Sequence, residues 1–265
     1  MEAKSQIQKT GEKLLAKIGD LKTAEEYVEA LKKEKYAPRT IQFYTWTLAA
    51  VVKDSALSAK LKEMSWTLKM QLEETENDQK KTPEQEENWV EWEKMGAVRA
   101  ALAKGKSKRE HWRHLVVCLY TLMPPLRLDW ADVVLSQTPT KTNYLNLEGK
   151  MLVLNQYKTV KTHGPQTIRL PDELCSVLRA SLEKYPRKYV VSALSADEPI
   201  NSALLSTLVK EAFEEATGRS VTLQLLRRIY ASHSLKDAPS IRQMEADAKA
   251  LGHSVATHHK YRKID

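Results

Sequence analysis

The chain has 265 residues, of which 42% are hydrophobic, and a formal net charge of +8 with a pI near 9.2. This length suffices for one large domain or two modest ones, and the basic balance suggests a polyanionic partner such as nucleic acid. No apolar run approaches the roughly 18 residues of a membrane-spanning helix, and the first residues lack the apolar core of a signal peptide, so we expect no membrane partner.

The charge is unevenly distributed along the chain. Residues 1–72 carry 13 Lys+Arg against 9 Asp+Glu, residues 73–93 carry two lysines against nine acids, and residues 94–265 carry 27 Lys+Arg against 16 acids. We therefore predict a first domain over 1–80, an acidic exposed linker over 81–93 and a second domain over 94–265. A solvated helix end that runs into a loop is the plainer interpretation of the acidic segment.

The first domain reads as helical. Apolar residues recur at helical spacing over Leu21–Lys33, Arg39–Val52 and Ala56–Leu72. Thr23 and Glu26 have the spacing of a capping box at the start of the first of these helices. The basic residues of this domain, Lys35 and Arg39 among them, would contact DNA phosphates.

The second domain reads as mixed. Trp89–Leu102 and Lys108–Leu122 are predicted helices, and the alternating residues of Asn143–Asn155 predict a hairpin with its turn at 148–150. Thr167–Leu170 is a third strand. A helix follows Pro171 and runs through Glu183. Further helices are predicted at about 200–216, 222–235 and 239–251. The fold class is therefore mainly α with a small antiparallel β-sheet.

The end of the chain carries a distinctive motif. The triplet Leu251-Gly252-His253 is followed eight residues later by Tyr261, and Arg227 lies 26 residues before His253 in the run LLRRIYASH. Arg127 follows a double proline in PPLRLDW, and Lys158 ends the predicted strand MLVLNQYK. In this order the residues resemble the catalytic set of the tyrosine recombinases, the phage-integrase-type enzymes that exchange DNA strands.

The resemblance implies a helical core-binding domain and an α+β catalytic domain. It also implies roles for five residues. Tyr261 would be the nucleophile that forms a 3′-phosphotyrosyl bond, and Lys158 the general acid for the leaving 5′ oxygen. The remaining three, Arg127, Arg227 and His253, would hold the phosphate, and arginine suits this task because its planar fork binds phosphate through two hydrogen bonds. No metal and no cofactor, ATP included, is expected.

Each of these residues also has a structural interpretation. Arg127 could form a salt bridge with Asp129 or Asp132. Lys158 could be an ordinary surface lysine, and Lys161 competes with it for the role of general acid and is otherwise expected to bind DNA. Tyr261 could simply be a packing residue. A helical pair, His111 and His114, has metal-ligand spacing, but the sequence brings no further ligand near it, so we interpret it as a helix surface.

Two features depart from the family's pattern. The histidine that usually lies three residues before the second arginine is replaced by Gln224, which can still hydrogen-bond phosphate but cannot transfer a proton. The spacing from His253 to Tyr261 is one residue shorter than the commonest family spacing. His258 or His259 could then take part in the chemistry.

Three segments, PPLRLDW, NQYKTVKTHGPQ and LGHSVATHHKYRKID, are similar to the integrases of eukaryotic DNA viruses, virophages and related mobile elements. The expected partner is double-stranded DNA, with assembly to a tetramer on paired sites. The expected location is intracellular, in a host nucleus or at a site of viral replication, in keeping with Cys118 and Cys175 as buried free thiols. Two alternatives are a type IB topoisomerase-like enzyme and a catalytically silent DNA-binding protein on the same fold.

Overall fold

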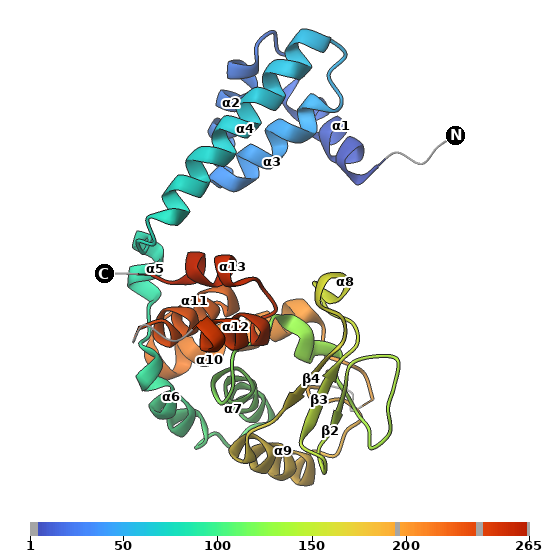
Figure 1. The fold of residues 1–265 in the computed structure, drawn as a ribbon, viewed down its shortest axis with the longest axis vertical. Helices are drawn as coiled ribbons and strands as arrows, with labels where there is room; N and C mark the ends of the chain where they lie inside the picture. The colour runs from blue at the N-terminus through green and yellow to red at the C-terminus, as the bar shows by residue number, and fades with distance from the viewer. Residues whose placement is uncertain (1–4, 194–196, 237–240, 264–265) are drawn as a thin grey trace. The chain divides into compact units, whose positions relative to one another are not determined.

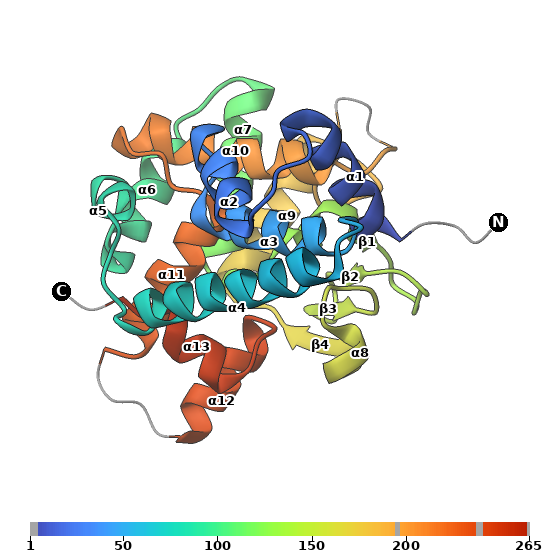
Figure 2. The same cartoon turned by 90° about the horizontal axis from the view of Figure 1, so that it is seen from above.

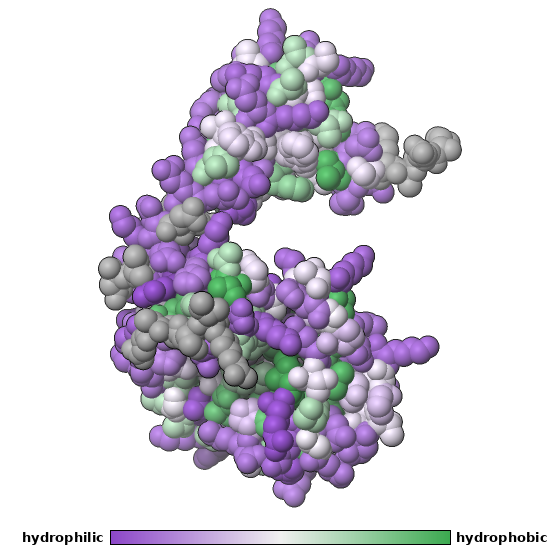
Figure 3. All heavy atoms as spheres, viewed as in Figure 1, coloured by the Kyte–Doolittle hydropathy of each residue, from purple (hydrophilic) through white to green (hydrophobic). Residues whose placement is uncertain are grey.

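The structure, a computed structural model, describes residues 5–193, 197–236 and 241–263 (Figure 1). The contacts within the chain divide it into two compact units, Met1–Asp78 and Gln79–Asp265. Each unit has its own cluster of buried apolar side chains. None of the helices in the described ranges combines the length and apolarity needed to cross a bilayer. Hydrophilic side chains cover most of the visible face of both units (Figure 3).

The first unit is built from four helices. They are α1 (Gln6–Ile18), α2 (Ala24–Lys33), α3 (Pro38–Ala49) and α4 (Ser55–Asn77). The α3 and α4 helices pack side by side, and Ser58 Oγ donates to the Ala49 carbonyl at one end of their contact (Figures 1 and 2). The core between the helices contains Tyr27, Leu31, Leu48 and Leu61, all fully buried.

The predicted start of α2 is confirmed in detail, whereas α1 was not predicted. Thr23 Oγ1 accepts from the Glu26 main-chain N–H at 3.2 Å, and Glu26 Oε2 accepts from the Thr23 main-chain N–H at 3.2 Å. This reciprocal pair is the capping box that the sequence predicted. Pro38 occupies the first turn of α3, where its fixed φ suits the helix and its missing N–H costs nothing.

The second unit holds the remaining elements. Its helices are α5 (Pro83–Asn88), η1 (Trp92–Lys94), α6 (Met95–Leu102), α7 (Lys108–Thr121), η2 (Leu128–Asp132), α8 (Val160–His163), α9 (Asp172–Lys184), α10 (Ser202–Thr217), α11 (Leu223–Ser234), α12 (Ile241–Ala250) and α13 (Val255–Tyr261). The predicted helix over 239–251 thus begins at residues outside the described ranges. The short helices α8 and α13 were not predicted, because neither has enough residues for an apolar period to show.

The sheet of the second unit has four strands in the order β1-β2-β3-β4. They are β1 (Val134–Leu135), β2 (Tyr144–Asn146), β3 (Met151–Leu154) and β4 (Gln166–Arg169). The predicted hairpin is β2–β3, paired antiparallel with Asn146 opposite Met151, and β4 continues antiparallel to β3. The short β1 runs parallel to β2, so the sheet is mixed and not purely antiparallel. Two residues give no alternating pattern from which β1 could have been predicted.

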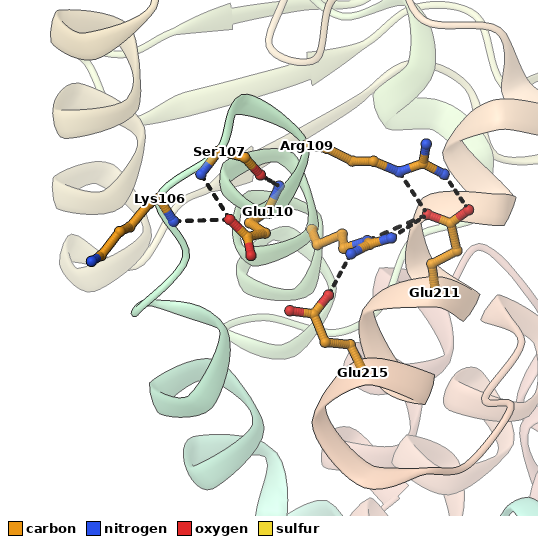
Figure 4. A network of polar contacts seen from close by, with 7 residues as sticks. Lys106, Ser107, Arg109, Glu110, Glu211 and Glu215 are labelled. Carbon is orange, nitrogen blue, oxygen red and sulfur yellow. Dashed lines mark hydrogen bonds and ion pairs between the residues drawn. The ribbon is translucent and has the colours of Figure 1, made fainter.

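Ion pairs join α7 to α10 at the surface of the second unit (Figure 4). Arg109 Nη2 lies 2.5 Å from Glu211 Oε1, and Arg113 bridges Glu211 at 3.0 Å and Glu215 at 2.5 Å. At the start of α7, Ser107 and Glu110 form a second capping box. The pairs fix the register of two helices whose apolar faces lie in the core.

Residues 81–93 are part of the second unit. They form α5 and η1, and between these two helices Trp89 and Val90 are buried in the core of the unit. The Trp89 carbonyl accepts from Arg219, and Asn88 Oδ1 accepts from the Ser220 main-chain N–H at 2.6 Å. The glutamates of this stretch are exposed as its composition suggests, but the buried Trp89 and Val90 anchor it.

Candidate active site

The Leu251-Gly252-His253 triplet ends α12 in a defined turn. Gly252 has φ +65°, and its main-chain N–H donates to the Lys249 carbonyl at 2.9 Å. The His253 main-chain N–H donates to the Ala248 carbonyl at 3.0 Å. These two bonds form a Schellman motif, with glycine at the left-handed position that other residues adopt only under strain. The turn leaves the carbonyls of Leu251 and Gly252 free to accept other donors.

Both arginines identified from the sequence donate to these carbonyls. Arg127 Nη1 lies 2.9 Å from the Gly252 oxygen and 3.5 Å from the Leu251 oxygen. Arg227 Nη2 lies 2.7 Å from the Leu251 oxygen, while its Nη1 donates to the Pro125 oxygen at 2.7 Å. The turn therefore brings two guanidinium groups together. The positive φ favours glycine at position 252, and a Cβ there would lie 2.9 Å from Arg127 Nη1, so the guanidinium would have to shift.

The two guanidinium groups are not neutralised by carboxylates. The side chains of Arg127 and Arg227 donate to main-chain oxygens, and Arg227 also hydrogen-bonds the Tyr261 side chain, so within the described ranges the salt bridge of Arg127 with Asp129 or Asp132 that the sequence left open is not formed. Burial, followed by the charge of Arg127, lowers the pKa of Arg227 to about 10. Asp129 interacts electrostatically with both arginines, so two positive groups share one carboxyl and the pair retains a positive balance that attracts an anion.

Tyr261 ends α13 and faces these groups. Its ring centroid lies 5.8 Å from Arg227 Cζ and 5.3 Å from Arg228 Cζ. It meets the His253 ring edge to face, at 4.9 Å between centroids and 81° between planes. The α11 and α12 helices both contact α13 and so hold it in place.

An open cleft of about 720 Å³ joins most of the predicted residues. Its lining includes Arg127, Lys158, Gln224, Arg227 and Tyr261. His253 does not line the cleft, because its ring is buried behind Tyr261 with only 6% of the residue exposed. The cleft is wide and polar-rimmed, a shape suited to an extended ligand that lies across it.

The structure separates the two candidate lysines. Lys158 lies in the segment between β3 and α8, four residues beyond the end of the strand, and its side chain is exposed at the cleft. Lys161 is exposed on α8 and is not part of the lining. Thr159 links this segment to the turn, since its Oγ1 donates to the Gly252 oxygen at 3.3 Å. In the first unit, Lys35 and Arg39 are exposed on either side of the start of α3.

Several lining residues were not found from the sequence. Ser202 and Ser206 come from the first turns of α10, and Thr222 is the N-cap of α11. The N-termini of two helices therefore face the cleft and add partial positive charge to it. Asp129 also lines the cleft, and burial raises the pKa of its carboxyl. Only the N-cap pattern at Thr222 gave a signal in the sequence, and nothing there connected it with the arginines.

His258 is a further residue of the site. It is fully buried, and its Nδ1 lies 3.1 Å from His253 Nε2. His259, by contrast, is exposed. Away from the cleft, His111 hydrogen-bonds Ser181 Oγ at 2.8 Å and His114 contacts the sulfur of Cys118 at 3.4 Å, so both have neighbours without a metal. Within the described ranges no three His, Cys, Asp or Glu residues are grouped as metal ligands.

Comparisons with known proteins identify the fold. No family model matches the sequence, and no curated protein is detectably similar to it. Among solved structures, the XerA recombinase matches 99% of this chain and 89% of its own, with a TM-score of 0.51 and 14% identity. A lambda integrase dimer bound to a COC′ core site matches 98% of this chain and 73% of its own, with a TM-score of 0.63 and 15% identity. The chain has the tyrosine recombinase fold over nearly its whole length.

Proposed function

We propose that this protein is a site-specific DNA recombinase that cuts and rejoins strands through a covalent 3′-phosphotyrosyl intermediate. The observation that carries the proposal is the pair of guanidinium groups of Arg127 and Arg227, held by one turn and without a salt bridge to a carboxylate in the described ranges, beside the Tyr261 ring. A phosphodiester in the cleft would supply the missing anion. The N-termini of α10 and α11 add to the same field.

The reaction assigns a task to each residue. Tyr261 Oη attacks phosphorus in line, the bond to the 5′ oxygen breaks, and Lys158 supplies the proton that the leaving oxygen needs. Arg127 and Arg227 hold the two non-bridging oxygens as their charge grows. Gln224, exposed at the cleft, hydrogen-bonds the phosphate or a neighbouring group. Because the bond energy is retained in the protein–DNA linkage, a 5′ hydroxyl of another strand can reverse the step.

The first unit is proposed to be the core-binding domain, with Lys35 and Arg39 on phosphates, and Lys161 is proposed as a further phosphate contact in the second unit. One of the similar solved structures, the lambda integrase dimer, is bound to a COC′ core site, which supports double-stranded DNA as the partner. We further propose assembly to a tetramer on paired sites. The three segments that resemble viral and virophage integrases favour integration of a mobile genome, acting in a host nucleus or at a site of viral replication.

A suicide substrate tests the proposal. A nicked DNA releases a short fragment after cleavage and so traps the covalent protein–DNA adduct, which is detected on a denaturing gel. We expect adduct with the natural protein and none with Tyr261→Phe, which removes one oxygen and leaves DNA binding intact. Adduct formed by the phenylalanine variant would assign the attack to another residue. Sedimentation on paired sites separates a recombinase from a topoisomerase-like enzyme, which acts as a single protomer.

The silent DNA-binding protein is the second candidate, and Gln224 is the observation that favours it. An amide cannot accept a proton, so a site that depended on this position for proton transfer would be inactive. DNA binding without any adduct, on substrates that span the protein's own recognition sequence, would establish this alternative.

A further inference from the structure

His253 and His258 form a buried hydrogen-bonded pair behind the nucleophile. His253 is 6% exposed and His258 is fully buried. His253 Nε2 lies 3.1 Å from His258 Nδ1, and His258 Nε2 lies 3.2 Å from Ser234 Oγ. Ser234 Oγ in turn lies 3.2 Å from the Ala231 carbonyl oxygen. A continuous chain of hydrogen bonds thus runs from the end of α11 to the histidine of the Leu-Gly-His turn.

The donor and the acceptor of each of these hydrogen bonds follow from the last group in the series, the Ala231 carbonyl. A carbonyl oxygen only accepts, so the Ser234 hydroxyl donates its proton to Ala231 and its oxygen accepts from His258 Nε2. A neutral imidazole carries one N–H, which leaves His258 Nδ1 as the acceptor for His253 Nε2–H. The remaining nitrogen, His253 Nδ1, therefore carries a lone pair and no proton.

Both rings are neutral at neutral pH. Burial, with the charges of Arg227, His258 and Arg127, lowers the pKa of His253 to about 3. Burial also lowers the pKa of His258, with contributions from His259 and Arg227, while the carboxylate of Asp247 acts in the opposite direction. The tautomer assignment thus applies to the protein under ordinary conditions.

The unprotonated nitrogen belongs to a ring that packs against the ring of the nucleophile. His253 Nδ1 is buried and has no hydrogen-bond partner among the described residues, and the ring that carries it meets the Tyr261 ring at 4.9 Å between centroids. A buried acceptor without a partner is unusual in a folded protein. A role as phosphate donor would require the opposite tautomer, with the proton on Nδ1.

Resting on the proposed strand cleavage, we propose that His258 is a positioning residue that holds His253 in its Nε2–H tautomer, so that His253 Nδ1 accepts the hydroxyl proton of Tyr261. As the tyrosine oxygen bonds to phosphorus, its proton moves to Nδ1 and the bond to the 5′ oxygen breaks. The resulting imidazolium donates to His258, which Asp247 faces. The pair supplies the proton acceptor that Gln224 cannot be.

Nitrogen NMR on the full-length protein tests the tautomer without any reaction. In protein with ¹⁵N-labelled histidine, two-bond nitrogen–proton correlations distinguish protonated from unprotonated ring nitrogens. We expect an unprotonated Nδ1 and a protonated Nε2 for His253. His258→Leu should mix the two forms, whereas His258→Asn, whose Oδ1 can replace Nδ1 as acceptor, should keep the natural form. His259→Asn is the matched control at an exposed neighbour. A protonated Nδ1 in the natural protein would overturn the proposal.

Single-turnover adduct formation tests the consequence. We expect His258→Leu to slow cleavage about tenfold or more, His258→Asn to restore most of the rate, and both variants to bind DNA as the natural protein does. Thermal unfolding identifies variants that have lost their fold. If a variant has lost its fold, the NMR spectrum of the natural protein decides whether His253 has the proposed tautomer. Equal cleavage rates in folded His258→Leu and natural protein would overturn the positioning role while the recombinase proposal stands. Absence of adduct in the natural protein would instead overturn the recombinase proposal, and the proposed proton transfer would be overturned with it. The NMR result would still decide the tautomer of His253.

Discussion

The two units differ in what they bury. In the first unit the buried threonine and serine hydroxyls each donate to a main-chain carbonyl. Thr45 donates to Ile41 and Thr47 to Tyr44 within one helix, and Ser65 donates to Gln42 across two helices. In the second unit the described buried Asp, Glu, His, Lys and Arg side chains all lie within residues 227–263. They are Arg227, Asp247, His253, His258 and Lys263.

This difference shows where the fold accepts an energetic cost. A hydroxyl bonded to a carbonyl is nearly neutral in a core, whereas a buried charge must be compensated by hydrogen bonds or by a partner. Arg227 is compensated by carbonyls, which satisfy its donors and leave its charge available. A purely structural core would replace such groups with apolar residues, so their concentration in one segment marks the site.

Replacing Arg227 should give the largest effect. In Arg227→Lys one ammonium cannot reach both the Pro125 and the Leu251 oxygens, so unfolding should need about 1–3 kcal/mol less and cleavage should fall by about 100-fold or more. Lys62→Arg, at an exposed position of the first unit outside the proposed DNA contacts, is the control and should leave both unchanged within about 0.5 kcal/mol. Denaturant unfolding and the adduct assay measure the two effects. Similar results for the two variants would remove the contrast between the units.

The substitution Gly252→Ala should have the next largest effect on stability and cleavage. Its φ of +65° disfavours a side chain, and the added Cβ would lie 2.9 Å from Arg127 Nη1. We expect a loss of about 1–2 kcal/mol in stability together with slower cleavage, because the guanidinium must move. Gly218→Ala is the matched control, since it has φ +69° but open space around its Cβ. The Gly218→Ala variant should lose stability, and its rate of cleavage should not change. Equal effects on cleavage would show that the arginine position is not set by this turn.

The sequence predicted the parts of this site that depend on residue type and order. Arg127, Lys158, Arg227 and Tyr261 could be placed together because their spacing resembles a known catalytic set, and the structure lines one cleft with them. Capping boxes and the β2–β3 hairpin follow from local rules that need only a few neighbouring residues.

The sequence could not predict contacts that depend on the direction of a carbonyl or a ring. The amino-acid sequence does not show that the Leu251 carbonyl oxygen accepts a hydrogen bond from Arg227, or that His258 is buried and His259 is not. The short elements β1, α8 and α13 also have no period to detect. Trp89 and Val90 lie in an acidic segment, and their burial is set by residues more than 100 positions away, such as Arg219.

Charge removal in the first unit should have a smaller effect, confined to binding. Lys35→Gln and Arg39→Gln each remove one proposed phosphate contact, so DNA affinity should fall a few-fold and the slope of log affinity against log salt should decrease by about one for each change. Cleavage at saturating DNA should not change. The measurement is a salt titration of binding by fluorescence anisotropy. A loss of cleavage at saturation would mean that this unit does more than bind.

The dependence of stability on pH should show the smallest difference between the two units. The pKa of His253 is lowered to about 3 and that of His258 is also lowered, so the unfolded chain binds more protons than the folded one at pH values below the ordinary histidine pKa of about 6.5. Stability contributed by neutral His253 is therefore full above pH 6.5 and decreases as the pH falls from there toward 3.

The lowered pKa values of His111 and His114 add to the same trend, so the comparison must be made between variants. His253→Asn should take up about one proton fewer on unfolding near pH 5 than the natural protein, whereas exposed His259→Asn should match it. Denaturant midpoints measured from pH 7 to 4 give these numbers, and an unchanged slope in His253→Asn would show that His253 is charged in the folded state.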